Sequence, residues 1–120
     1  MILLDTSIWV DHLRGTNAVL REVLGAADGG VHPFVIGELA LGHLRRRDEI
    51  LGLLESLPQL PVASHEDVMN LVDLQDLAGA GIGWVDAHLL CAARLQGWRI
   101  LTLDRGLERV AARLGVAAAR

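Results

Sequence analysis

The sequence predicts an α/β fold, with a parallel sheet that carries helices on both faces. Short apolar segments that end at turn residues or acids are typical of buried strands, and they occur at residues 1–5, 31–32, 60–63, 99–104 and 116–119. Between them lie longer segments whose apolar residues recur every three or four positions, as on one face of a helix. Strands that alternate with helices favour a parallel sheet, here of about five strands.

The first half of the chain is expected to place two helices, at 6–13 and 18–27, between its first two strands. Pro33 has the position of a first helical residue, and the helix that it opens is predicted to continue to about Arg46. Asp48 is expected to cap the next helix, because apolar residues follow it at helical spacing.

In the second half, Pro61 places the third strand at an edge of the sheet, since proline cannot donate to a central ladder. Ser64 is expected to cap a helix that runs to about Ala78, and the glycine-rich segment AGAGIG follows as a loop. The next helix spans 85–96 and ends at Gly97. The last helix has an apolar stripe formed by Leu107, Val110, Ala111 and Leu114.

The composition predicts one domain over residues 1–120 that associates with a second copy. The hydrophobic residues make up 52% of the chain, and 13 glycines bring the apolar share to about 63%, against about 45–50% in most soluble domains. No apolar run approaches the ~18 residues of a membrane span, so we expect a homodimer or larger assembly and no membrane partner. Apolar candidates for the interface are Ile8, Trp9 and Leu13, or the later segment around Leu77.

Several classes of site are excluded by residues that the chain lacks. All 11 basic residues are Arg, which excludes Schiff-base chemistry and a phosphate-binding loop with its lysine. The single Cys91 excludes a disulfide framework and a thiolate zinc site, and the amino-terminal residues do not resemble a signal peptide, so we expect a cytoplasmic protein. The net charge of −4 excludes binding of nucleic acid by overall attraction, although a local site remains compatible with it.

Four acids stand at positions where a parallel sheet places its ligand site. Asp5 and Asp104 end strands and begin helices, although each could equally be a helix cap. Glu38 shares an apolar helical stripe and therefore needs a cation, a proton or a donor, unless it lies at the edge of the stripe and reaches water. Asp86 follows the glycine-rich loop at a helix start, where a first-turn acid is the alternative interpretation. If these carboxylates converge, they form a hard-cation site suited to Mg²⁺ or Mn²⁺ and to phosphodiester chemistry.

Together these segments resemble the PIN-domain ribonucleases, and more specifically the VapC-type toxins of bacterial toxin–antitoxin pairs. The matching segments are LLDTSIWVDHLR, GELALG and GIGWVDAHLLCAARLQGWRILTLDRGLERVAARLGV, in that order, and the resemblance covers essentially the whole chain. It implies a PIN-like α/β/α sandwich. It also implies a catalytic and metal-binding quartet of Asp5, Glu38, Asp86 and Asp104, with supporting hydroxyls at Thr6, Ser7 and Thr102.

The resemblance implies a Mg²⁺-dependent endoribonuclease toxin, with Mn²⁺ as an alternative ion, that cleaves RNA with a metal-activated water. It also implies a cognate VapB-type antitoxin as partner. Two alternatives stay open at this point. One is a catalytically silent PIN-like module that binds RNA or protein, and the other is a DNA or structure-specific nuclease of the same fold.

Other polar residues are given structural interpretations. His88 lies about 200° around the helix from Asp86, which favours packing or a structural hydrogen bond over metal ligation. The run Arg45–Arg47 is interpreted as a solvated helix junction, with phosphate contact as the alternative.

Overall fold

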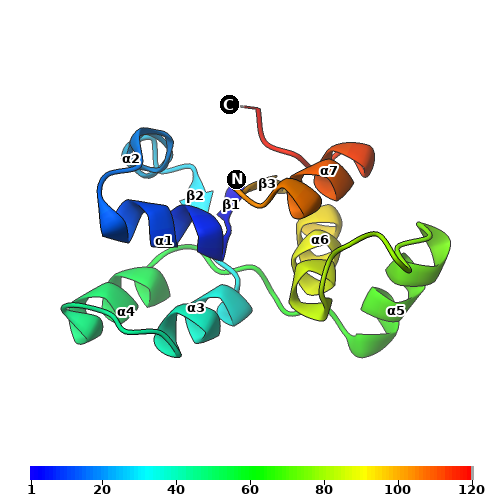
Figure 1. Cartoon of the computed structure of the whole chain (residues 1–120), viewed down its shortest axis with the longest axis horizontal. Helices are drawn as coiled ribbons and strands as arrows, with labels where there is room; N and C mark the ends of the chain where they lie inside the picture. Colours follow the sequence, from blue (N-terminus) through cyan, green and yellow to red (C-terminus); the bar gives the residue numbers. More distant parts are fainter. Residues whose placement is uncertain (120) are drawn as a thin grey trace.

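Three parallel strands form the centre of the computed structural model, which describes residues 1–119 (Figure 1). Strand β1 (Ile2–Leu4) lies between β2 (Gly29–Gly30) and β3 (Arg99–Leu101), so the order is β2-β1-β3. Both neighbours pair with β1 in parallel, and Leu3 faces Gly30 on one side and Ile100 on the other. The predicted α/β class is therefore confirmed.

The expectation of about five strands was wrong in number. The second strand lies at Gly29–Gly30 instead of 31–32. The strand expected at 60–63 is replaced by a single parallel bridge just before it, Gln59 with Val31, and the fifth shortens to the bridge of Ala117 with Ile100. Pro61 follows the first of these bridges closely and has no N–H to extend the pairing. The sheet therefore has three strands within the described residues, and each edge is widened by one bridge.

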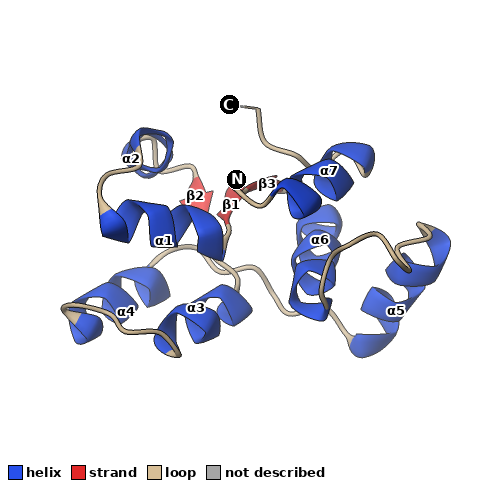
Figure 2. Ribbon diagram, in the orientation of Figure 1, coloured by secondary structure: helices blue, strands red, loops and turns tan. Residues whose placement is uncertain are grey.

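Helices occupy most of the remaining chain (Figure 2). In the view of Figure 1, α1 to α4 lie to the left of the strands or below them, and α5 to α7 lie to the right. Helix α1 packs against α2 and α3, α3 packs against α4, and α5 packs against α6. Their bounds are α1 (Thr6–Arg14), α2 (Ala18–Gly25), α3 (Pro33–Ala40), α4 (Arg47–Ser56), α5 (His65–Leu74), α6 (Trp84–Gln96) and α7 (Arg105–Arg113).

Three helices end earlier than the sequence suggested. Helix α2 ends at Gly25 instead of Ala27, which has a left-handed φ of 53°. Helix α3 ends at Ala40 instead of about Arg46, and Arg46 has the left-handed φ of 53° that a continuous helix does not allow. Arg46 is consequently the N-cap residue of α4, and Asp48 lies in the first turn instead of capping it. Helix α5 ends at Leu74, because Asp76 has a φ of 54°.

The caps predicted around α5 and α6 are confirmed. Ser64 Oγ accepts a hydrogen bond of 3.0 Å from the Asp67 N–H at the start of α5. Gly97 follows α6 with a φ of 70°, a conformation that glycine adopts without steric cost. Gly30 is required for a different reason, since a Cβ there would lie 2.5 Å from the Trp98 ring.

One apolar core joins the sheet to the helices, and it includes residues expected at an interface. Ile8 and Trp9 are each 1% exposed, and Leu77 is 5% exposed. These three side chains are part of the core of a single chain and are not available to a second copy, whereas Leu13 is partly exposed. No helix within residues 1–119 is long and apolar enough to cross a membrane.

Candidate functional site

Asp5 follows β1 directly and is held by two hydroxyl groups. Its Oδ2 accepts hydrogen bonds from Thr102 Oγ1 at 2.7 Å and from Ser7 Oγ at 2.9 Å. Asp5 is the N-cap residue of α1, yet its side chain makes no cap hydrogen bond. The buried carboxylate is therefore positioned by hydroxyls from α1 and from the end of β3, and the simple cap interpretation does not apply to it.

Asp104 lies beside this hydroxyl pair and also caps α7. Its Oδ1 accepts a hydrogen bond of 3.0 Å from the Leu107 N–H, and its own N–H donates to Thr102 Oγ1 at 3.0 Å. Ser7 Oγ accepts the N–H of Leu103 at 2.9 Å. Asp104 is thus both a helix cap and a neighbour of Asp5 through Thr102.

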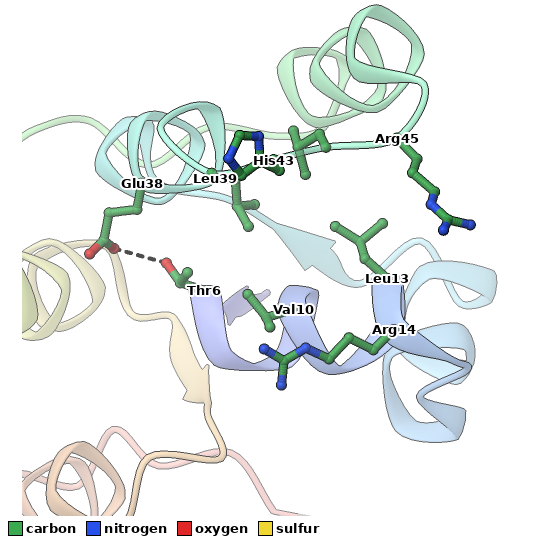
Figure 3. A pocket seen from close by; sticks show the side chains of 10 residues that line it. Thr6, Val10, Leu13, Arg14, Glu38, Leu39, His43 and Arg45 are labelled. Carbon is green, nitrogen blue, oxygen red and sulfur yellow. Dashed lines mark hydrogen bonds between the residues drawn. The ribbon is translucent and has the colours of Figure 1, made fainter.

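Glu38 approaches from α3 and is exposed at the edge of its apolar stripe. Val35 and Leu39 are buried on α3, whereas the Glu38 side chain is exposed. Its Oε1 accepts a hydrogen bond of 2.8 Å from Thr6 Oγ1 at the start of α1 (Figure 3). The first and third helices are joined at this point, and the Glu38 carboxylate remains accessible.

The Asp86 carboxyl is affected by the charges of the other three acids. It lies in the first turn of α6, where Oδ2 accepts the Gly83 N–H at 3.3 Å. Partial burial raises the pKa of the Asp86 carboxyl, and the negative charges of Asp5, Asp104 and Glu38 raise it further, against the opposing effect of the Gly83 hydrogen bond. The structure therefore brings the predicted quartet into one neighbourhood.

The glycine-rich loop before α6 approaches the start of α7 beside Asp104. A Cβ on Gly106 would lie 3.3 Å from the carbonyl oxygen of Gly81 and 3.3 Å from Asp104 Oδ1. The loop and the first turn of α7 are thus in close approach beside Asp104.

The carboxylates do not converge as a complete cage for an ion. Among residues 1–119, no three Asp, Glu, His or Cys side chains are placed to hold one metal ion together. Mg²⁺, however, usually keeps several waters and binds through only one or two carboxylates and the substrate phosphates. Carboxylate and hydroxyl oxygens are hard ligands, and a cation would relieve the repulsion that acts on Asp86, so the donor set fits a divalent metal.

The histidines near the site pack against aromatic rings. His88 is 6% exposed, and its ring makes edge contacts with Phe34 at 4.8 Å and with Trp84 at 4.9 Å between centroids. Burial and, to a smaller extent, the charge of His65 lower the pKa of His88. The geometry agrees with the expected packing role for His88.

His32 is a structural residue that the sequence analysis did not single out. Its Nδ1 accepts the Phe34 N–H at 2.9 Å and caps α3, and the ring is fully buried. Burial, with the charge of His88, lowers the pKa of His32 to about 4. A histidine directly before a helix-opening proline is the signal that could have predicted this cap.

A groove of about 600 Å³ extends from Glu38 between α1 and α3 (Figure 3). The sequence pattern did not predict it, because its walls come from two helices and from the turn after α3. The groove is lined by Thr6, Val10, Leu13, Arg14, Glu38, Leu39, Gly42, His43, Leu44 and Arg45.

Comparison with known proteins identifies the family. The PIN domain family matches residues 2–113. This chain belongs to the PIN-domain family. The PIN domain is 48% identical over 120 residues to Ribonuclease VapC32 of Mycobacterium tuberculosis, in strain CDC 1551 / Oshkosh and equally in strain ATCC 25618 / H37Rv. In both cases the similarity covers 99% of this chain and 97% of the relative, which confirms the predicted resemblance to VapC-type PIN ribonucleases.

A solved structure supports the same PIN fold. The crystal structure of PAE2754 from Pyrobaculum aerophilum superposes on this PIN domain with a TM-score of 0.64. The match covers 95% of this chain and 94% of that one, at 18% sequence identity. At this low identity the similarity establishes the fold alone.

Proposed function

We propose that this PIN domain is the endoribonuclease toxin of a toxin–antitoxin pair, and that it uses Mg²⁺ or Mn²⁺. The observation that carries the proposal is the position of Asp86, which is partly buried and repelled by three other carboxylates. Such an arrangement costs stability unless a cation joins it. The near full-length similarity to a protein named a ribonuclease supports RNA as the substrate.

The residues that would hold the metal are Asp5, Glu38, Asp86 and Asp104. When bound, the ion lowers the pKa of a water and polarises the scissile phosphate. Thr102 and Ser7 fix the Asp5 carboxylate, and Thr6 orients Glu38.

The chain contains no lysine, and within residues 1–119 the buried rings of His32 and His88 are packed against Phe34, so neither of these groups supplies a general base. Water activated by the metal is the proposed nucleophile.

The decisive experiment is cleavage of single-stranded RNA by the purified chain in Mg²⁺ and in excess EDTA. Asp5→Ala and Asp86→Ala should each reduce the rate by at least ~10³, which corresponds to about 4 kcal/mol of transition-state stabilisation. Asp73→Ala removes an exposed acid of α5 and serves as the matched control. Full cleavage in EDTA contradicts the metal mechanism. RNA binding without cleavage favours a silent module, and equal cleavage of DNA favours the broader nuclease.

A VapB-type antitoxin is the proposed partner of the chain. The net charge is −4, and the quartet alone contributes four negative charges. A partner arginine could form charge-assisted hydrogen bonds among these carboxylates and exclude metal or RNA. Coexpression with a small neighbouring gene should therefore suppress growth arrest by the chain, and Asp104→Ala should not arrest growth at all.

We further propose that the chain, as one PIN-like domain over residues 1–120, forms a homodimer in the cytoplasm. The high apolar content supports association, and Leu74 and Leu95 are 81% and 60% exposed on the neighbouring helices α5 and α6. Light scattering at about 10 μM should give twice the chain mass of 13.0 kDa. A monomeric mass without partner contradicts the dimer.

A further inference from the structure

We propose that single-stranded RNA leaves the acidic site along the groove between α1 and α3, with Arg14 and Arg45 contacting its phosphates. The inference rests on the proposed ribonuclease function and deepens it. It assigns a path for the strand and two binding residues outside the acidic quartet.

The groove is continuous with the acids. Thr6 and Glu38 line one end of it, and they are joined by the hydrogen bond drawn in Figure 3. In the same view Arg45 lies toward the opposite end, and the Arg14 side chain extends from that end back to the level of Val10. An RNA strand whose scissile phosphate lies at the acids must continue away from them, and this groove offers a depression that begins at one of those acids.

The two arginines are available to an anion. Within residues 1–119, neither Arg14 nor Arg45 makes an ion pair, and both side chains are exposed. Their neighbour Arg46 differs, because it pairs with Glu49 at 2.8 Å. In a chain with a net charge of −4, unpaired cations beside an acidic site give a polyanion the local attraction that the whole molecule does not provide.

The spacing assigns the arginines to phosphates beyond the scissile one. Arg14 ends α1 eight residues after Thr6, a backbone rise of about 12 Å along the helix axis, and its side chain extends back to the level of Val10, still away from the acids. Arg45 lies in the turn after α3 and faces the same groove. Contacts at this distance bind and orient the strand without touching the reacting atoms.

The groove floor suits nucleotide bases. Val10, Leu13 and Leu39 line it between the acidic and the basic ends. Aliphatic side chains can cover the apolar faces of bases without hydrogen bonds that depend on sequence, while the phosphates follow the cations. A peptide partner would need acidic side chains at the same spacing, and this alternative is one of the outcomes of the test.

The test compares Arg14→Gln/Arg45→Gln with a matched double variant, Arg21→Gln/Arg94→Gln. Arg21 and Arg94 are exposed, make no ion pair within the described residues and do not line the groove, so the second variant changes the overall charge equally. Binding of fluorescein-labelled single-stranded RNA is measured by anisotropy in Mg²⁺ at several salt concentrations, in an Asp104→Asn background. KM and kcat are measured in the chain that retains Asp104, and melting temperatures verify folding.

The groove variant should bind RNA roughly tenfold more weakly at low salt, with most of the kinetic loss in KM. The slope of log K against log salt should decrease in magnitude by about 1.4, because each phosphate contact on a single strand contributes about 0.7. The ratio of the RNA dissociation constant of the groove variant to that of the chain with both arginines should therefore be roughly sevenfold smaller at about 200 mM salt than at about 50 mM. The Arg21 and Arg94 control should keep the original slope.

Three results would overturn the inference. An unchanged slope in the groove variant means that no phosphate is bound there. An equal decrease in the control means that the effect comes from overall charge. Unchanged RNA binding with lost inhibition by a coexpressed antitoxin assigns the groove to a protein partner. Cleavage of RNA by the unsubstituted chain is measured alongside. Its absence rejects the ribonuclease function itself, whereas its presence with an unchanged slope rejects only the groove.

Discussion

The Thr102 hydroxyl donates a 2.7 Å hydrogen bond to Asp5 Oδ2 although 97 positions separate the two residues. β1 and β3 are paired in parallel, so their carboxyl ends meet at one edge of the sheet. The same hydroxyl accepts the Asp104 N–H at 3.0 Å. One threonine therefore couples the acid after the first strand to the acid that begins the last helix.

Thr102→Val should test this coupling. Valine has nearly the same shape but neither donates to Asp5 nor accepts from Asp104, so it leaves a buried carboxylate and an N–H with fewer partners. We expect a loss of roughly 1–3 kcal/mol in stability and a clear decrease in cleavage rate. Thermal melting and RNA cleavage measure the two effects. Thr102→Ser restores the hydroxyl and should recover most of both, and a valine variant that behaves like the parent chain argues against the coupling.

Two substitutions of Asp104 can distinguish its role as the cap of α7 from the effect of its negative charge. Its Oδ1 caps α7 through the Leu107 N–H, and asparagine caps a helix about as well as aspartate. Asp104→Asn should keep the cap and remove one of the charges that repel Asp86, so in EDTA it should melt no lower than the parent chain. Asp104→Ala loses the cap and should be about 1 kcal/mol less stable than the asparagine variant. An asparagine variant that melts lower than the parent chain in EDTA would reduce Asp104 to an ordinary cap.

Asp86 should make the metal-free protein more stable as the pH falls. Its folded pKa is raised, first by burial and then by the neighbouring acids, so the folded state holds this proton more tightly than the unfolded chain does. The resulting stability is complete below the unfolded pKa and is lost as the pH rises through the folded pKa. Asp86→Asn can keep the Gly83 hydrogen bond but does not titrate, so its advantage over the parent chain in EDTA should grow between about pH 4 and pH 7.

At neutral pH, metal should make the parent chain more stable than Asp86→Asn, the opposite of the order expected in EDTA. Mg²⁺ at about 100 times its dissociation constant should stabilise the parent chain by about 2.7 kcal/mol and stabilise Asp86→Asn less. Melting curves in EDTA and in Mg²⁺ measure both variants. An equal effect of Mg²⁺ on the two chains would place the metal away from Asp86.

The sequence predicted the proximity of Asp5 and Asp104 better than it predicted the lengths of the strands. Asp5 and Asp104 were placed together because parallel strands end at one edge, a consequence of topology that holds however short the strands are. Strand lengths depend on hydrogen bonds to neighbours far along the chain, and a single bridge such as Ile100 with Ala117 leaves no periodic signal. Short segments with the same apolar pattern can therefore form either a strand or a single bridge.

Side-chain environments were harder to predict than positions. Trp9 had the pattern of an interface residue yet lies in the core, because the exposure of a helix face depends on which elements pack against it. Glu38 shares its stripe with buried residues but is exposed at the groove, whose walls come from two helices. The groove itself is a tertiary feature that no local pattern encodes.

His32 should make the stability of the fold depend on pH in the opposite direction to Asp86. Its pKa is lowered to about 4 from an ordinary value of 6.5, first by burial and then by the charge of His88, so the folded state binds this proton less tightly. The stability from neutral His32 is present above pH 6.5 and is lost as the pH falls toward 4. The full shift corresponds to a loss of about 3 kcal/mol.

Melting in EDTA, with Asp86→Asn as the background of every chain, should isolate this effect, because that background lacks the titrating Asp86 carboxyl. The background chain with His32 intact should lose stability steadily from about pH 6.5 to pH 4. His32→Asn places an amide oxygen where Nδ1 accepts the Phe34 N–H, so it can retain the cap while removing the titration, and its pH dependence should be weaker even if its stability at neutral pH is lower. His43→Asn changes an exposed histidine and serves as the matched control. Parallel slopes for the background chain and His32→Asn would show that the burial of His32 does not govern acid unfolding.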